Sequence, residues 1–65
     1  MNCYDEIFNT IKELIENKEI SSYQINKDTG ISYGNINAMR RRERRIEYLS
    51  LKNAKILYEY AKKVL

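Results

Sequence analysis

Two short helix signals joined by a single glycine, both within residues 22–41, are the feature that most constrains how this chain folds. The first signal begins at Ser21, which is followed three residues later by Gln24. At this spacing the hydroxyl and the amide side chain can each satisfy an unpaired N–H group at a helix start. Ile20 and Ile25 occupy the two positions of a hydrophobic staple across the same cap. A capped helix is therefore expected to begin at residue 22.

The same signals return about ten residues further along the chain. Ser32 stands at a second cap position, and Ile31 and Ile36 stand at the matching staple positions. Gly30 lies between the two helices, where a left-handed C-cap is needed and glycine adopts it without steric cost. Two capped helices and a tight glycine turn predict a helix-turn-helix, a motif whose second helix enters the major groove of DNA.

Apolar residues at intervals of three and four predict a helix before this motif. Its apolar face comprises Tyr4, Ile7, Phe8, Ile11, Leu14 and Ile15. We expect this first helix to end at Asn17 and Lys18. The third helix should run from Tyr33 to Arg41, with Ile36 and Met39 facing the core.

The rest of the chain predicts a loop and a fourth helix. Residues 40–48 are interpreted as a frayed helix end and a loop, with Ile46 as its inward anchor, and Ser50 is interpreted as the next N-cap. The apolar stripe of the fourth helix comprises Ala54, Leu57, Tyr58, Ala61 and Val64 or Leu65. Ile56 and Tyr60 fall outside this stripe, so we consider them candidate contacts in a homodimer.

Composition favours an all-α fold, a compact domain of four or five helices spanning residues 1–65. The chain has two glycines and no proline, whereas sheet-rich domains of this size usually need more turn formers. One cysteine and no histidine exclude a structural zinc site, a disulfide framework and most nucleophile–base pairs. We therefore expect no metal, no cofactor, no small-molecule ligand and no enzymatic activity.

The N-terminal residues lack the features of a secretory signal, and no apolar run is long enough for a membrane span. We therefore expect a cytoplasmic protein with Cys3 as a free thiol.

Charge is distributed unevenly along the chain. Residues 1–20 contain five acids and two lysines, residues 21–48 contain six bases and three acids, and residues 49–65 contain four lysines and one acid. The net charges of these segments are therefore −3, +3 and +3. An acidic first helix beside a basic remainder suggests a domain that turns one face toward a polyanion, although a solvated mixture of charges is the alternative.

The beginning of the third helix is where base contacts are expected, because an α-helix fits the major groove and its N-terminal side chains reach the base edges first. The candidate base contacts are Ser32, Tyr33, Gly34, Asn35, Asn37, Ala38 and Arg41. Gly34 and Ala38 would allow close approach of the helix to the duplex. The alternative for Gly34 is that the first turn merely tolerates it, and for Asn35 and Asn37 it is a solvated helix surface.

Phosphate contacts are expected from five arginines within residues 40–45, since guanidinium groups match phosphate oxygens and provide salt-sensitive affinity. The N-terminus of the second helix offers free N–H groups and a positive dipole end for a further phosphate. The candidate phosphate contacts are Ser22, Tyr23, Arg40, Arg42, Arg44 and Arg45. A basic segment that is only a solvated face is the alternative.

Residues 22–41 and their flanking helices resemble a Cro/C1-type helix-turn-helix domain, the lambda-repressor-like fold, over nearly the whole chain. Gly30 matches the turn glycine, Ile25 the buried residue of the first motif helix, and Ile36 with Met39 the buried residues of the second. In that family the groove-facing residues fall at Ser32, Tyr33, Gly34, Asn37 and Ala38. Residues 46–50 resemble the segment before the fourth helix in small repressors of phages, plasmids and mobile elements of Gram-positive bacteria.

The chain departs from the family pattern at two places. Asn26 stands where the family has a small residue packed against the second motif helix, so it needs a hydrogen-bond partner or solvent. Arg41, Arg42 and Glu43 replace the asparagine and glycine that usually follow the recognition helix. The resemblance implies a transcriptional repressor that binds an inverted repeat as a homodimer. A plasmid-partition or replication-control DNA binder and a small protein-interaction adaptor or inhibitor remain as alternatives.

Overall fold

The computed structural model describes the backbone of residues 3–65 and side chains from residue 5 onward, so the expectations for the side chains of Cys3 and Tyr4 lie outside the described residues. The elements are α1 (Cys3–Glu16), α2 (Ser22–Thr29), α3 (Tyr33–Arg40), the 3-10 helix η1 (Ile46–Tyr48) and α4 (Leu51–Val64). Residues 3–65 contain no strand. The all-α fold is thus confirmed.

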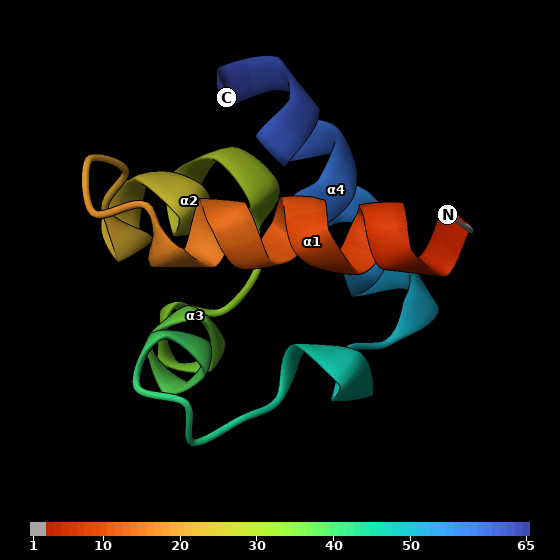
Figure 1. Cartoon of the computed structure of the whole chain (residues 1–65). Helices are drawn as coiled ribbons and strands as arrows, with labels where there is room; N and C mark the ends of the chain where they lie inside the picture. Colours follow the sequence, from red (N-terminus) through yellow and green to blue (C-terminus); the bar gives the residue numbers. More distant parts are fainter. Residues whose placement is uncertain (1–2) are drawn as a thin grey trace.

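The four α-helices enclose one core. In Figure 1, α1 crosses the front of the molecule, α4 passes behind it, and α3 lies below it on the side of α2. Contacts join α1 to α4, α3 and η1, while α2 packs against α3 and α4. The helix-turn-helix is therefore attached to the rest of the domain along both of its helices.

The start of α2 is capped as predicted, but only half of the expected capping box forms. The Ser21 hydroxyl accepts from the Gln24 backbone N–H at 3.0 Å. The Gln24 side chain donates to Asp28 instead of returning to Ser21. At the other end Gly30 has φ of 78°, and its N–H donates to the Asn26 carbonyl at 2.8 Å. This left-handed C-cap is the conformation for which the glycine was predicted.

The end of α3 differs from the prediction by one residue, since α3 ends at Arg40 and Arg41 is its C-cap. The next residue, Arg42, has φ of 62°. The Arg42 N–H donates to the Met39 carbonyl at 3.1 Å, and the Glu43 N–H donates to the Ala38 carbonyl at 2.8 Å. These two bonds form a Schellman motif, with an arginine in the left-handed position that usually favours glycine or asparagine.

The segment after α3 contains more structure than predicted. We expected a frayed end and a loop over residues 40–48, but residues 46–48 form η1, in which the Leu49 N–H donates to the Ile46 carbonyl at 3.1 Å. Ile46 packs against the core, which confirms it as the inward anchor. Ser50 then caps α4, because its hydroxyl accepts from the Asn53 N–H at 3.2 Å.

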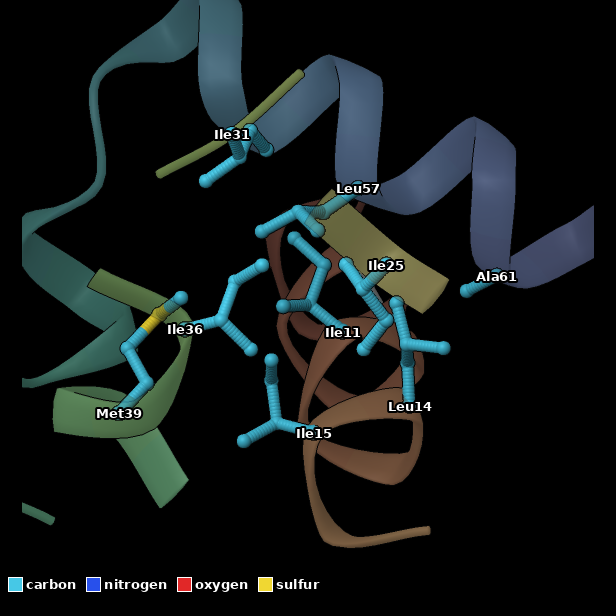
Figure 2. Packing of buried hydrophobic residues seen from close by; sticks show 9 residues of the cluster. All are labelled: Ile11, Leu14, Ile15, Ile25, Ile31, Ile36, Met39, Leu57 and Ala61. Atoms are coloured by element: carbon cyan, nitrogen blue, oxygen red, sulfur yellow. The ribbon is translucent and has the colours of Figure 1, made fainter. Parts of the chain in front are cut away.

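All four helices and the turn contribute to the core. Its buried apolar residues are Ile11, Leu14, Ile15, Ile25, Ile31, Ile36, Met39, Leu57 and Ala61. Figure 2 shows Ile36 of α3 directed toward Ile11 and Ile15 of α1, with Met39 alongside Ile36 and with Leu57 of α4 beside Ile25 and Ile11. The predicted inward positions are confirmed for Ile11, Leu14, Ile15, Ile25, Ile36 and Met39, whereas Ile7 and Phe8 of the predicted α1 face are only half-buried.

The predicted stripe of α4 is corrected at both margins. Ile56 and Tyr60 were expected to lie outside it, yet both are partly buried and pack against the core. Val64 and Leu65 were offered as its last members, but their side chains are 41% and 49% exposed. The reason is geometric: α4 extends past the end of the core, and α2 covers the face that carries Tyr60.

Candidate nucleic-acid interface

Two polar contacts hold α2 and α3 as one unit. The Ser22 hydroxyl donates to Asn37 Oδ1 at 2.6 Å, and Asn26 Nδ2 donates to the Ile31 carbonyl at 2.7 Å. The partner that Asn26 requires is thus the backbone of the turn, an arrangement that satisfies a half-buried amide. These contacts fix how α3 is presented to solvent.

The first turn of α3 is exposed. Ser32, Tyr33 and Gly34 all lie on the surface, and the Tyr33 side chain is 52% exposed. The Ser32 hydroxyl accepts from the Asn35 N–H at 3.1 Å, which completes the predicted cap. A Cβ added to Gly34 would meet only Ser32 Oγ, at 3.7 Å. No neighbour within residues 3–65 therefore requires a glycine at this position.

The Asn37 side chain is less accessible than a base contact was expected to be. It is half-buried, and its Oδ1 atom accepts the Ser22 hydroxyl. This contact directs the amide oxygen toward α2, which leaves the amide nitrogen as the atom suited to a ligand. Bidentate recognition of adenine needs both amide atoms of asparagine, whereas the nitrogen alone donates to acceptors such as a guanine O6, a thymine O4 or a phosphate.

Asn35 and Arg44 are brought together, although they are nine residues apart. Arg44 Nη1 donates to Asn35 Oδ1 at 2.8 Å. Ala38, half-buried on the same helix, supplies the carbonyl that accepts from the Arg44 N–H at 3.2 Å. The loop after α3 is therefore folded back onto α3, so that a candidate phosphate contact lies beside a candidate base contact.

Three further arginines are exposed and paired with carboxylates. Arg41 lies 3.2 Å from Glu43, Arg42 lies 3.7 Å from Glu16, and Arg45 lies 3.2 Å from Glu47. The guanidinium of Arg45 also lies 6.0 Å from the centre of the Tyr48 ring. Ion pairs this exposed contribute little to stability and exchange readily for another anion. The four arginines 41, 42, 44 and 45 are hereafter called the arginine surface.

Arg40 is not part of this surface. Its Nη2 atom donates to the carbonyls of Asn17 and Ile20 at 3.2 and 2.5 Å, and its Nε atom is buried without a partner among the described residues. Burial lowers the pKa of the guanidinium below its usual value. Sequence reasoning assigned Arg40 to phosphate, but the structure uses it to join α3 to the connection between α1 and α2.

The remaining candidates are divided between the surface and the interior. Tyr23, at the start of α2, is 64% exposed, whereas Ser22 is 7% exposed and its hydroxyl is bonded to Asn37. A phosphate at this helix start would meet the backbone of Ser22 and not its side chain. The Tyr60 hydroxyl donates to Asp28 at 2.7 Å, and Ile56 packs against the core, so both candidate dimer contacts have partners within the chain.

Sequence reasoning missed the acids that hold the arginine surface. Glu43 and Glu47 each stand two residues after the arginine that they pair with, a local signal that was available. Glu16 is 26 residues before Arg42, and only the packing of α1 beside α3 brings them together. Three of the four arginines therefore have a carboxylate within 4 Å that another anion would have to replace.

Comparison of the chain with protein-family models, with curated proteins and with solved structures finds no match in any of the three. No helix within residues 3–65 is long and apolar enough to cross a membrane. The described part of the chain also contains no cluster of acidic or cysteine side chains that would hold a metal ion.

Proposed function

We propose that this protein binds double-stranded DNA, with the first turn of α3 in the major groove and the arginine surface on the phosphates. The observation that carries the proposal is the exposed, glycine-containing start of α3 together with Arg44, which donates to Asn35 of the same helix. An α-helix can reach base edges only if its leading turn is unobstructed, and affinity requires cations placed to meet the flanking backbone. The exposed first turn of α3 supports the first requirement, and Arg44, which donates to Asn35 of the same helix, supports the second.

The expected roles follow from the side chains. Tyr33 contacts a thymine methyl group or a phosphate, and Gly34 lets the helix backbone approach the groove. Arg41, at the end of α3, is the arginine placed to reach a guanine, and the other members of the arginine surface contact phosphates. These phosphate contacts set the register of the protein on the duplex and make binding sensitive to salt.

The proposed biological output is repression of transcription by occupation of a promoter, with two copies of the chain on an inverted repeat. The chain has a domain small enough to cover one half-site, and dimers bind half-sites about one helical turn apart. A partition or replication-control protein would use the same interface. Footprinting separates these roles, because it shows whether the bound site lies in a promoter.

The test is a titration of the protein into the DNA upstream of its own gene and into a scrambled duplex of equal length, at two salt concentrations. We expect a preference on the order of a thousandfold for one site, with a symmetric footprint. Equal and salt-sensitive binding to both duplexes would mean a DNA-binding surface with its target elsewhere. Absence of binding at low salt would overturn the proposal and favour the adaptor, in which the arginine surface meets an acidic protein.

A further inference from the structure

We propose that a second copy of this chain docks on an apolar groove between the beginning of α1 and the beginning of α4. The groove is lined by Ile7, Phe8, Leu49, Leu51, Ala54 and Tyr58, and we call it the α1–α4 groove. It lies on the side of the molecule opposite α2, where η1 leads into α4 (Figure 1). Its role on DNA depends on the proposed function, but self-association through it does not.

The groove exposes apolar surface that the domain itself does not cover. Leu51, in the first turn of α4, is 89% exposed although its side chain is apolar. Phe8 is half-buried and lies outside the buried core cluster. Single exposed apolar residues are normal, but an aromatic and several aliphatic side chains around one hollow form the kind of patch that marks an interface.

The charges around the groove favour a second copy over other occupants. Lys52 and Lys55 of α4 and Glu47 of η1 line it, and Glu6 of α1 stands at its end, where it accepts a hydrogen bond from Tyr58. The rim therefore carries two positive and two negative groups, of which Glu47 is also paired with Arg45 in the exposed ion pair described above. A two-fold interface brings the same patch of both subunits together, so each lysine side of one copy can meet an acidic side of the other.

The position of the groove also suits two half-sites on one duplex. Leu49 lines both the groove and a neighbouring hollow that contains Asn35 and Arg44, so the groove shares an edge with the candidate nucleic-acid interface. In a two-fold dimer the partner contributes the same edge. Ile56 and Tyr60, the contacts expected from sequence, are used within the chain and are replaced by this surface.

The experiment is sedimentation equilibrium of the full chain from micromolar to millimolar concentration, with the variant Leu51→Glu. A glutamate in the first turn of a helix is favoured by the helix dipole, so we expect this variant to fold normally, as checked by circular dichroism. The control is Leu65→Glu, which makes the same change in charge and polarity at an apolar residue far from the groove, 49% exposed. We expect a monomer–dimer equilibrium whose dissociation constant rises at least about tenfold in Leu51→Glu and is unchanged in the control.

Two outcomes would overturn this inference: a monomer at every concentration, or a dimer that Leu51→Glu leaves intact. Titration of duplexes that carry one or two half-sites separates this result from the proposed function. If the chain dimerises through the groove but binds no duplex, the proposed function fails and the interface stands. If both hold, Leu51→Glu should bind a single half-site normally and lose the added affinity of the inverted repeat.

Discussion

At Gly34 the fold would accept an alanine, whereas the proposed DNA contact requires the glycine. An alanine methyl group would meet only Ser32 Oγ at an ordinary distance, and alanine is the better helix former. We expect Gly34→Ala to raise the free energy of unfolding by about 0.5 kcal/mol and to weaken duplex binding, since the methyl group stands between α3 and the base edges. Thermal unfolding and a duplex titration measure the two effects. Unchanged binding by the stabilised variant would favour the interpretation that the first turn merely tolerates glycine.

Asn37 and Arg44 provide a contrast between a base contact and a phosphate contact. We expect Arg44→Ala to weaken binding similarly on all sequences and to lower the salt slope by about one, whereas Asn37→Ala should alter preference at one base position. The second variant also leaves the buried Ser22 hydroxyl without its acceptor, which costs about 1 kcal/mol of stability. Titrations over a set of single-base operator variants make the comparison. Uniform effects from both substitutions would contradict base recognition by Asn37.

At the scale of elements, the ends of α2 and α3 use the same backbone conformation with different residues. Gly30 and Arg42 have φ of 78° and 62°, a region that disfavours side chains by roughly 1 kcal/mol. We expect Arg42→Gly to stabilise the protein by about that amount and Gly30→Ala to destabilise it similarly. Chemical denaturation measures both changes.

The same pair of variants tests why an arginine occupies the end of α3. If Arg42 contacts a phosphate, Arg42→Gly should bind DNA more weakly and with a smaller salt slope although its fold is more stable. Gly30→Ala removes no charge, so it should keep the salt slope of the original chain. Full retention of affinity and slope by Arg42→Gly would remove Arg42 from the interface.

At the scale of the whole molecule, the contact between Tyr60 of α4 and Asp28 of α2 makes stability depend on pH in two directions. Burial, and then the hydrogen bond to Asp28, raise the pKa of Tyr60 from 10.0 to about 12. Hydrogen bonds from Gln24 and from Tyr60 lower the pKa of Asp28 below 3.8. Stability from Tyr60 is thus fully present below pH 10.0 and is lost as pH rises toward 12, whereas stability from Asp28 is present above pH 3.8 and is lost as pH falls below it.

Unfolding curves across the acidic and alkaline ranges measure this dependence. We expect Tyr60→Phe to reduce the alkaline loss, and Asp28→Asn to reduce the acid loss together with part of the alkaline one, because the carboxylate contributes to both shifts. An alkaline transition that is the same in Tyr60→Phe would assign it to other groups of the domain.

Elements of this fold were predictable wherever a local rule decides the outcome. The caps at Ser21, Ser32 and Ser50 and the left-handed turn at Gly30 are formed by residues within four positions of each other, and apolar spacing is enough to place the buried side chains of α1 and α3. η1 was missed because a charged segment with one apolar anchor has no helical period, and its form depends on Ile46 reaching the core.

The candidate site was predictable as a set of residues but not as an arrangement. Residue types and their place after a turn indicated α3 and the arginines, while the separate use of Arg40 depends on two carbonyls in the connection between α1 and α2 that lie 20 and 23 residues away. The half-burial of Asn37 likewise depends on α2 lying against α3. Spacing along a chain does not encode such contacts.

By itself, the sequence determined the all-α class, the boundaries of the helix-turn-helix to within a residue and the concentration of positive charge after it, because caps, turns and periodic apolar faces act over a few residues. Only the tertiary structure decided that Ile56 and Tyr60 belong to the domain's own packing, that Arg40 joins α3 to the connection between α1 and α2, and that an exposed apolar side chain lies at the α1–α4 groove. The physical reason is that burial depends on which helices meet, and in a domain of 65 residues one helix crossing decides which face of α4 stays exposed.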